Sequence, residues 1–326
     1  MSDNIMVSIC CITYNQEKYI ATAIESFLMQ KTNFKYEVII HDDASTDNTT
    51  KIIREYQEKY PDIIKPIYQS ENQYSKGIIP SQLTYKKAQG KYITICEGDD
   101  YWTDENKLQK QVDFLEKNND YIATSHWCEV VDINGNVSND YPYKHRVFNF
   151  KKETYTFKDY QKNEIPGHVN TIMFRNIYTN AKYDYGKIYY ASRLVGDRTT
   201  YLIIALSGKI HVIPEFMSSY RYVIMNNGTN YCSVVKNKNK LYDWFKYYNN
   251  LEKGVYEVMN KKISLKRLKY DVFIEAVITY IKTPKFDNKE VLIKIINEYN
   301  KLEVAMYLPI IVIRRIKRSI SFKLSK

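Results

Sequence analysis

The sequence lacks any long hydrophobic run. Among its 326 residues, no apolar stretch approaches the about 20 residues that a membrane-spanning helix needs. A signal peptide is not expected either, because the first predicted strand starts within a few residues of Met1. These two absences argue against a membrane-spanning or secreted chain, and we expect a cytoplasmic one.

Cysteine is also scarce. The five cysteines form no Cys-x-x-Cys pair, and an odd number of them leaves no complete disulfide framework. Cys10 and Cys11 stand in an apolar run, where we expect them to act as small hydrophobic residues in a reducing compartment.

The sequence has no internal repeat and no glycine-rich phosphate loop. After the first predicted strand the chain reads Ile12-Thr13-Tyr14-Asn15-Gln16-Glu17, which contains no glycine. A Rossmann dinucleotide site and a sugar-phosphate nucleotidyltransferase would both call for such a loop, so both classes are disfavoured.

What is present is the composition of a packed protein with an unusual charge. Apolar residues make up 44% of the chain and charged residues 26%, so we expect a folded core rather than disorder. The length suits one large α/β domain with an extension, or two modest domains. The net charge of +11 favours polyanionic partners, namely nucleic acid, anionic lipid or phosphate-bearing substrates.

The first part of the chain alternates strand and helix patterns. Short apolar runs predict strands over residues 7–14, 36–40, 63–68 and 92–96. Apolar residues at helical spacing predict helices over residues 17–30, 48–60, 82–88 and 107–117. This alternation predicts a mostly parallel sheet covered by helices, and such sheets bind ligands beyond the carboxyl ends of their strands.

The pattern after residue 123 is mixed. We expect strands over residues 123–131, 171–174, 210–213 and 216–222, and a helix over residues 197–207. We place the end of the α/β domain at residue 225. Residues 226–326 are expected to form a flexible loop followed by a basic, mostly helical extension.

An acidic turn, Glu97-Gly98-Asp99-Asp100, follows the fourth predicted strand. Two adjacent carboxylates at the end of a buried strand are costly unless a cation neutralises them. Hard oxygen ligands suit Mg²⁺ or Mn²⁺, which bind one or two carboxylates together with substrate phosphates. Gly98 is expected to allow the sharp turn. A solvated, Asp-rich turn without a function is the alternative interpretation.

A second acidic element, Asp42-Asp43-Ala44-Ser45-Thr46-Asp47, follows the second predicted strand. Ser45 or Asp47 alone could cap the next helix. The pair Asp42 and Asp43 exceeds what a cap requires, so one of these carboxylates could accept hydrogen bonds from a base or a ribose hydroxyl.

Three motifs in this order resemble the family 2 glycosyltransferases: Val7-Ser8-Ile9-Cys10-Cys11-Ile12-Thr13-Tyr14-Asn15, His41-Asp42-Asp43-Ala44-Ser45-Thr46-Asp47-Asn48-Thr49, and Ala88-Gln89-Gly90-Lys91-Tyr92-Ile93 leading into the acidic turn. The resemblance covers roughly residues 6–225. It implies an inverting enzyme with a GT-A-type nucleotide-binding α/β fold, a donor half over residues 1–100 and an acceptor half over residues 101–225. The stretch Asp99-Asp100-Tyr101-Trp102, followed by Lys107-Leu108-Gln109-Lys110-Gln111, is similar to members that build bacterial surface polysaccharides.

The resemblance also implies roles for single residues. Asp43 would recognise the base, commonly uracil, Asp99 the ribose or sugar, and Asp100 the Mn²⁺ or Mg²⁺ ion. The family's catalytic base matches Asp197. The residues implied in donor binding are Thr13, Tyr14, Asn15, Asp43 and Asp99.

Asp197 stands in Val195-Gly196-Asp197-Arg198-Thr199 at the start of a predicted helix. A carboxylate stabilised by the helix dipole is the structural alternative for this position. As a general base, Asp197 would deprotonate an acceptor hydroxyl that attacks from the face opposite the leaving group. That geometry inverts the anomeric centre, so an α-linked donor would give a β-linked product.

The sequence departs from the family in one respect. Many relatives carry a histidine after a Tyr-Arg pair near the end of the domain, as a further metal or phosphate contact. Here Tyr220-Arg221-Tyr222 is followed by no histidine, so the role is vacant or passes to Arg221, Asn226 or Asn227.

Three further residues are acceptor-side candidates, and two of them have structural alternatives. Trp102 could stack on a sugar face or pack under the cleft. His168, in Pro166-Gly167-His168-Val169-Asn170-Thr171, lies where acceptors bind in relatives, but a lone histidine is often structural. Arg198 is the third candidate, next to Asp197.

The C-terminal stretch 306–326 interleaves isoleucines with arginines and lysines at helical spacing. This pattern is typical of an amphipathic helix that rests on anionic lipid, although a solvated helix packed on the domain would look similar. A lipid-linked acceptor would be presented at such a surface, so we expect the protein on the inner face of the cell membrane.

The sequence therefore predicts a metal-dependent transferase that moves a hexosyl or N-acetylhexosaminyl group from a nucleotide sugar, commonly a UDP-sugar, to a saccharide or lipid-linked acceptor. The alternatives are a catalytically weak sugar-binding or assembly protein of the same fold and a nucleic-acid polymerase. Gly98-Asp99-Asp100 has the shape of a polymerase metal site, but the basic residues concentrate in the C-terminal stretch, and no nucleic-acid partner is expected.

Overall fold

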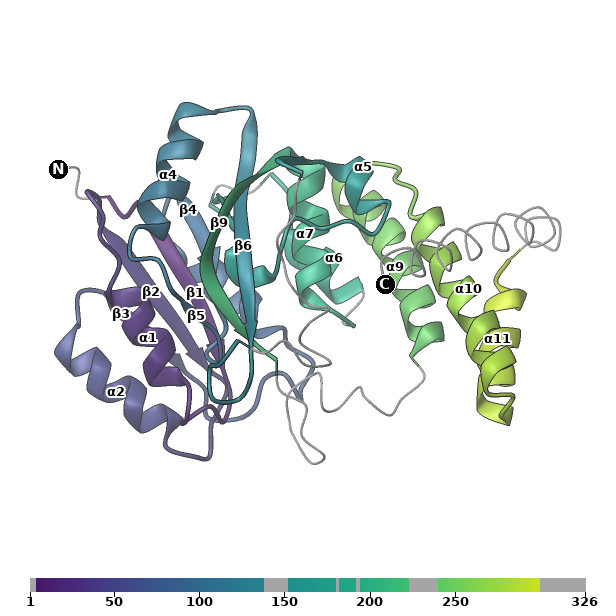
Figure 1. Cartoon of the computed structure of the whole chain (residues 1–326), viewed down its shortest axis with the longest axis horizontal. Helices are drawn as coiled ribbons and strands as arrows, with labels where there is room; N and C mark the ends of the chain where they lie inside the picture. Colours follow the sequence, from purple (N-terminus) through teal and green to yellow (C-terminus); the bar gives the residue numbers. More distant parts are fainter. Residues whose placement is uncertain (1–3, 138–151, 180–181, 192–193, 223–239, 300–326) are drawn as a thin grey trace. The chain divides into compact units, whose positions relative to one another are not determined.

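The computed structural model describes residues 4–137, 152–179, 182–191, 194–222 and 240–299 (Figure 1). The chain divides into two compact units, Met1–Val234 and Val235–Lys326. The expected domain boundary at residue 225 lies outside the described residues, as do Asn226, Asn227 and the stretch 306–326, so the expectations for them stay predictions.

The first unit begins with a parallel half-sheet. Its strands lie in the order β3-β2-β1-β4, and every neighbouring pair is parallel. The strands are β1 (Val7–Thr13), β2 (Tyr36–Asp42), β3 (Ile64–Tyr68) and β4 (Tyr92–Ile95). The helices of this part are α1 (Ile20–Leu28), α2 (Thr49–Lys59), α3 (Pro80–Lys87) and α4 (Lys107–Lys117). The expected alternation of strands and helices is confirmed.

Helix α1 begins at Ile20 and not at residue 17 as expected. The backbone amides of residues 15–17 are instead hydrogen-bonded to side chains that follow β2. The Asn15 amide donates to Ser45 Oγ at 2.9 Å, and the Glu17 amide donates to Asp47 Oδ2 at 3.1 Å. These bonds join the loops after β1 and β2, and helix α1 begins only beyond the residues that make them.

The core of this half lies between the sheet and helices α1, α2 and α4. On α1 the residues Ile20, Ala23, Ile24 and Phe27 are fully buried, at the spacing of one helical face. Burial of each large aliphatic or aromatic side chain contributes about 1.5–3 kcal/mol. Cys10 and Cys11 are buried and free, as expected for small hydrophobic residues.

The sheet continues from β4 through β8, β6 and β9 to β5, with β7 paired to β9. These strands are β5 (Tyr101–Trp102), β6 (Tyr121–Val131), β7 (Thr154–Tyr155), β8 (Met173–Arg175) and β9 (Lys209–Arg221). Strand β8 is antiparallel to both β4 and β6, and β9 is parallel to β6. In the part of the chain that the structure describes, the fold is thus an α/β fold with a mixed sheet whose first half is parallel.

The two short strands expected over residues 210–213 and 216–222 are one strand, β9. Its pairing with β6 jumps from His126 opposite Ile213 to Trp127 opposite Phe216. Pro214 lies in the interval. Because proline has no amide hydrogen to donate to a ladder, the strand is irregular there, and the sequence pattern resembles two strands.

Helices α5 (Phe157–Tyr160), α6 (Tyr185–Ala191) and α7 (Gly196–Ser207) and the 3₁₀ turn Val169–Thr171 complete the first unit (Figure 1). Helix α7 is buried over most of its length, from Thr199 to Ala205. Its N-terminus carries Asp197.

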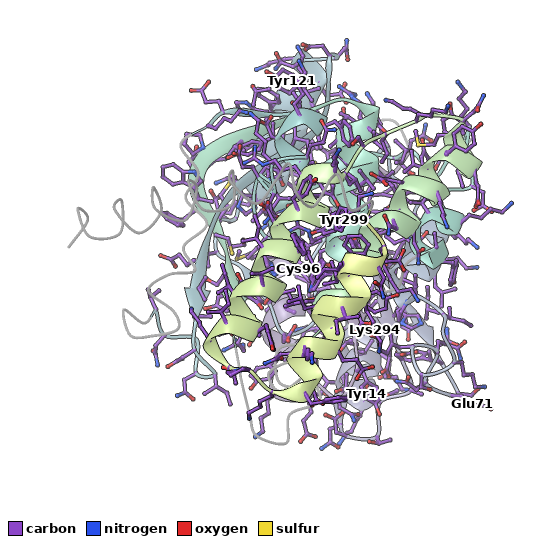
Figure 2. All side chains as sticks on the ribbon, turned by 90° about the vertical axis from the view of Figure 1, so that its right-hand side faces the viewer. Tyr14, Glu71, Cys96, Tyr121, Lys294 and Tyr299 are labelled. Carbon is purple, nitrogen blue, oxygen red and sulfur yellow. The ribbon has the colours of Figure 1, made fainter. Side chains whose placement is uncertain are left out.

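Strand β8 lies between β4 and β6 in the sheet and is antiparallel to both, so β4 and β6 run in the same direction. Six strands therefore share one direction, namely β1, β2, β3, β4, β6 and β9. Their carboxyl ends therefore share one edge of the sheet. Figure 2 shows this polarity within the first unit: Tyr121, which starts β6, lies at the top of the view, and Tyr14, which follows β1, lies at the bottom. The shared edge is where a parallel sheet positions a ligand site.

The second unit contains helices α9 (Leu241–Met259), α10 (Lys266–Lys282) and α11 (Phe286–Asn297), as expected for a helical extension. Its small core joins Phe245, Phe273, Ala276 and Ile295. Tyr299, labelled in Figure 2, stacks on Tyr270 with ring centroids 5.6 Å apart. Within the described residues, no helix combines the length and the apolar character needed to cross a membrane.

Candidate functional site

The acidic turn after β4 is fastened to β1. The Gly98 amide donates to the Ile12 carbonyl at 3.0 Å, and the Asp100 amide donates to the Glu97 carbonyl at 3.0 Å. A Cβ atom at Gly98 would lie 2.5 Å from Gln16 Oε1 and 2.9 Å from Thr13 Oγ1. Glycine is therefore needed for close approach to the loop after β1, and not only for the shape of the turn.

Asp100 is 1% exposed and held from two other segments. Its Oδ1 accepts the Arg221 amide at 2.9 Å, at the end of β9. Its Oδ2 accepts Asn170 Nδ2 at 2.9 Å, and His168 Nδ1 lies 3.5 Å from the same oxygen. The carboxylate is thus fixed between the 3₁₀ turn and the last residue of β9.

Several carboxyl groups gather around this point. Burial raises the pKa of Glu97, Asp99 and Asp100, and neighbouring carboxylates add to the effect on Glu97 and Asp100. For Glu97 the largest of these neighbours is Asp197 from α7. Asp197 is thus close enough to the acidic turn to affect the pKa of Glu97, and its catalytic role stays a prediction. Such a group of negative charges favours a bound cation.

Asp197 itself lies in the first turn of α7 and is partly buried. Burial raises the pKa of its carboxyl to about 6, and the neighbouring Arg198 guanidinium opposes that rise. A carboxyl with this pKa is ionised at neutral pH but remains a usable proton acceptor.

Arg221 connects the acidic turn to the loop after β6. Its Nε donates to the Asp99 carbonyl at 3.1 Å, and its Nη1 donates to the Ile133 carbonyl at 2.9 Å. The guanidinium lies over the Tyr19 ring, 4.6 Å from the centroid. It also lowers the pKa values of Asp99 and Asp100, which burial raises. Its side chain positions the turn through backbone carbonyls.

The last residue of β1 and the loop after it supply three of the expected donor-site residues. Thr13 is 4% exposed and donates from Oγ1 to Gln16 Oε1 at 2.7 Å, whereas the Tyr14 side chain is 38% exposed. Asn15 has a left-handed φ of 53° and accepts the Thr46 amide on Oδ1 at 2.8 Å. Asparagine tolerates this backbone conformation well, so Asn15 joins the loops after β1 and β2.

Asp43 organises the loop that follows β3. Its Oδ1 accepts the Gln73 amide at 2.7 Å and its Oδ2 accepts the Tyr74 amide at 3.1 Å. Asp42 accepts the Ser45 amide at 3.1 Å and the Thr50 hydroxyl. Both carboxylates of the pair therefore hold loops in place, and the base contact implied for Asp43 stays a prediction.

Two of the acceptor-side candidates have clear packing partners. Trp102 is 2% exposed, donates from Nε1 to the Asn170 carbonyl at 3.1 Å and lies under Lys107 Nζ, 3.9 Å from the ring centroid. This geometry matches the packing alternative for Trp102. Arg198 donates to Asn163 Oδ1 and lies 5.8 Å from the Tyr160 ring centroid.

His168 is the N-cap of the 3₁₀ turn and lies beside Asp100, and the acceptor contact implied for it stays a prediction. Its ring stacks on Tyr220 with centroids 3.9 Å apart. Burial lowers the pKa of His168 to about 4, so its ring is neutral at pH 7 and its contact with Asp100 is not an ion pair.

Two buried residues were not anticipated from the sequence. Asn170 is fully buried, donates from Nδ2 to Asp100 and to the Ser219 carbonyl, and accepts Ser218 Oγ. Lys107 is fully buried and donates to Thr94 Oγ1 at 3.1 Å and Gln111 Oε1 at 2.8 Å. In the sequence, only its place in a polar run before a predicted strand could have indicated a role for Asn170. The burial of Lys107 was missed because a lysine at the start of a helix is usually exposed.

Among the described residues, no group of three or more His, Cys, Asp or Glu side chains could hold a metal ion. Asp100 and His168 together offer one carboxylate and one imidazole. A cation held there would need further oxygen ligands from a substrate, which is how Mg²⁺ usually binds beside phosphates. The residues present therefore fit a cation that binds together with a diphosphate, and they fit no autonomous metal site in this part of the chain.

The chain matches the model of Glycosyl transferase family 2 over residues 8–180. It is 34% identical over 215 residues to the uncharacterized protein Rv1520 of Mycobacterium tuberculosis, a match that covers 66% of this chain and 58% of that protein. The chain thus spans little more than half of that relative.

A second relative has a more specific name. The chain is 34% identical over 118 residues to the Escherichia coli UDP-Glc:alpha-D-GlcNAc-diphosphoundecaprenol beta-1,3-glucosyltransferase WfgD, covering 36% of this chain and 44% of that protein. Among solved structures, S. aureus TarS 1-349 in complex with UDP-GlcNAc gives a TM-score of 0.60 at 16% identity, over 89% of this chain and 79% of that one. The likeness to TarS shows a shared fold.

Proposed function

Because the chain belongs to glycosyl transferase family 2, we propose that it transfers a sugar from a nucleoside-diphosphate donor to a hydroxyl of a glycan or lipid-linked saccharide, with inversion at the anomeric carbon. The observation that supports the proposal is the electrostatic effect of Asp197, from the first turn of α7, on Glu97 in the acidic turn that holds Asp100. Asp197 would act on the acceptor hydroxyl, and Asp100 would act on the diphosphate of the donor.

The donor we propose is a UDP-sugar that delivers a hexosyl or N-acetylhexosaminyl group. The relative WfgD supports this choice, because its name gives UDP-Glc as the donor and a β-1,3 linkage as the product. Thr13, Tyr14 and Asn15 would line the nucleotide pocket, with Asp43 next to the base and Asp99 next to the ribose or sugar. They lie at or shortly after the carboxyl ends of β1, β2 and β4.

Asp197 is the proposed general base. Its carboxylate would accept the proton of the acceptor hydroxyl as that oxygen attacks the anomeric carbon from the face opposite the diphosphate. Asp197 lies in the first turn of a largely buried helix, which fixes its backbone. The next residue, Arg198, is an acceptor-side candidate.

Asp100 is the proposed protein ligand of a Mn²⁺ or Mg²⁺ ion. Such an ion, when bound, would neutralise negative charge on the diphosphate leaving group. The chain's own contribution is to keep Asp100 oriented, through the Arg221 amide and the Asn170 side chain.

We further propose that the protein acts in the synthesis of a bacterial surface polysaccharide such as a capsule, in the cytoplasm, resting on the inner face of the cell membrane. The name of WfgD includes a diphosphoundecaprenol acceptor, which is lipid-linked. The basic stretch 306–326, which lies outside the described residues, has the composition that would attract anionic lipid.

The proposal is tested with a panel of nucleotide sugars, measured for binding and for slow hydrolysis with Mn²⁺ or Mg²⁺. We expect the wild type to bind at least one UDP-sugar in the presence of metal, and Asp100→Ala to lose this binding. Asp120→Ala is the matched control, because Asp120 is an exposed carboxylate whose partner is Lys209. A wild type that binds no nucleotide sugar with either metal would overturn the proposal.

The stereochemistry gives a second test. Once a donor and an acceptor are known, NMR of the product should show a β linkage from an α-linked donor. An α-linked product would contradict the inverting mechanism and the role of Asp197.

A further inference from the structure

The side chain of His168 is held beside Asp100 by a well-fixed backbone. The His168 carbonyl accepts the Thr171 amide at 3.0 Å, Thr171 Oγ1 at 2.7 Å and Tyr201 Oη at 3.0 Å. A Cβ atom at Gly167 would lie 2.6 Å from both Ser125 Oγ and Thr171 Oγ1, so the preceding residue is packed tightly as well. The segment therefore has little freedom to move His168 away from the acidic turn.

The ring of His168 is fixed as firmly as its backbone. One face stacks on Tyr220, with ring centroids 3.9 Å apart and planes 23° apart. The side chain is only 12% exposed. Tyr220 precedes Arg221, whose amide holds the other oxygen of Asp100. The end of β9 thus contacts both residues: the Tyr220 ring stacks on His168, and the Arg221 amide binds Asp100.

The distance between the two side chains suits a shared cation. Nδ1 of His168 lies 3.5 Å from Oδ2 of Asp100, and Nδ1 accepts the Asn170 amide at a long 3.4 Å. Two adjacent ligands that each lie about 2.1 Å from one octahedral ion are about 3 Å apart. A side-chain shift of about half an ångström would therefore bring both atoms into one coordination shell, at the expense of a weak hydrogen bond.

We propose that His168 is a ligand, together with Asp100, of the divalent cation that binds with the donor diphosphate. This inference rests on the proposed function, since the remaining ligands would be diphosphate oxygens and water. The nitrogen ligand makes the site softer than a carboxylate site, so it favours a transition-metal ion such as Mn²⁺ over Mg²⁺.

The decisive measurement is the electron spin echo envelope modulation of Mn²⁺ bound to the full-length wild type with UDP. A directly bound imidazole nitrogen gives a ¹⁴N modulation, and we expect to observe it in the wild type. A Mn²⁺–UDP complex of the wild type without ¹⁴N modulation would overturn the inference, whatever any variant does.

The informative variant is His168→Phe, which keeps an aromatic ring against Tyr220 and removes the nitrogen. We expect its Mn²⁺ affinity with UDP, measured by Mn²⁺ electron paramagnetic resonance titration, to fall at least about tenfold, and the preference for Mn²⁺ over Mg²⁺ to narrow. The matched control is His211→Phe, because His211 also stacks on an aromatic ring, that of Phe114, but at the start of β9. Wild-type Mn²⁺ affinity in His168→Phe would mean that stacking is the whole role of His168.

The two proposals fail differently. If Asp100→Asn loses Mn²⁺ while the wild type shows no ¹⁴N modulation, the transferase proposal stands and the role of His168 falls. If the wild type binds no Mn²⁺ with either UDP or GDP, the metal-dependent donor site falls, and the role of His168 falls with it.

Discussion

At the residue scale, the acidic turn and Asp197 are linked by electrostatics across the site. Asp197 comes from α7, and its carboxylate is a cause of the raised pKa of Glu97 in the turn. Local sequence alone would give Asp197 the alternative role of a helix N-terminal carboxylate, which the dipole stabilises. Burial raises the pKa of Asp197 to about 6, which is opposite in direction to the lowering that a helix dipole gives.

We predict that Asp197→Asn lowers kcat by about 10²–10⁴-fold, because the amide cannot accept the acceptor's proton. The Kd for the UDP-sugar should change little, since Asp197 is assigned to the acceptor side. Steady-state kinetics and donor titration measure the two effects. Asp120→Asn serves as the control at an exposed carboxylate. A kcat for Asp197→Asn within a few-fold of wild type would remove Asp197 from the base role.

The pH dependence of the reaction follows from the same carboxyl. A raised pKa means that Asp197 is protonated, and useless as a base, below about pH 6 and ionised above it. We therefore expect kcat/KM to rise through an acidic limb with an apparent pKa of about 6 and then to level off. A pH–rate profile with its acidic limb near the ordinary pKa of a carboxyl, about 4, would contradict this assignment.

At the element scale, one buried turn joins several strands. Asn170, in the 3₁₀ turn, contacts Asp100 after β4, Trp102 in β5 and Ser218 and Ser219 in β9. The side-chain amide of Asn170 bonds to the acidic turn after β4 and to β9, and its backbone carbonyl accepts the Trp102 indole of β5. Removal of such a side chain leaves buried donors and acceptors without partners.

We predict that Asn170→Ala lowers the free energy of unfolding by about 1–3 kcal/mol and also weakens metal-dependent UDP binding by about 10–100-fold. Urea unfolding and isothermal titration with Mn²⁺ and UDP measure these effects. Asn134→Ala, in the exposed turn after β6, is the control and should change neither quantity. If Asn170→Ala lost stability but bound Mn²⁺ and UDP normally, Asn170 would have no role in orienting Asp100.

The start of α4 gives the second prediction at this scale. Burial lowers the pKa of the Lys107 ammonium to about 7, although Cys96 and Asp104 oppose that shift. Above this pKa the folded chain holds fewer protons on Lys107 than the unfolded chain does. Stability from this group should therefore rise with pH between about 7 and the ordinary lysine pKa of about 10.4.

We expect the difference in free energy of unfolding between wild type and Lys107→Met to change in favour of wild type from about pH 7 to about pH 9. Lys107→Met has no titrating group at this site, so the comparison cancels the pH dependence of other residues. Chemical denaturation at several pH values provides the measurement. A difference that stays constant with pH would show that Lys107 keeps its ordinary pKa in the folded protein.

At the scale of the whole molecule, the strong positive charge of the chain leads to a prediction about membrane binding. The net charge is +11, and the basic stretch 306–326 lies outside the described residues. Within the described part, no helix meets the requirements for crossing a membrane.

We predict that the full chain co-sediments with anionic liposomes and that deletion of residues 308–326 largely abolishes this. Each lysine or arginine near an anionic surface contributes about 1 kcal/mol, so the binding should weaken as salt increases. Neutral liposomes are the control for lipid that lacks the charge. Full co-sedimentation of the deletion variant would show that another part of the chain binds lipid, or that the stretch has no such role.

Much of the first half of the fold could be predicted from the sequence. The expected helix over residues 107–117 matches α4, and the strands of the parallel half were placed to within a few residues. Apolar runs and helical spacing are local signals, and these elements obey them. The start of α1 and the single long β9 were missed, because distant side chains and the interval at Pro214 decided them.

The candidate site divides in the same way. The sequence by itself determined the kinds of side chains at the strand ends, since alternating strands and helices bring Asn15, Asp43 and Asp100 to one edge of a parallel sheet. Only the tertiary structure placed His168 and Asn170 beside Asp100 and buried the Lys107 ammonium over the Trp102 ring. Those contacts depend on the antiparallel insertion of β8 and on the course of β9, which are long-range pairings without a periodic signature in the sequence.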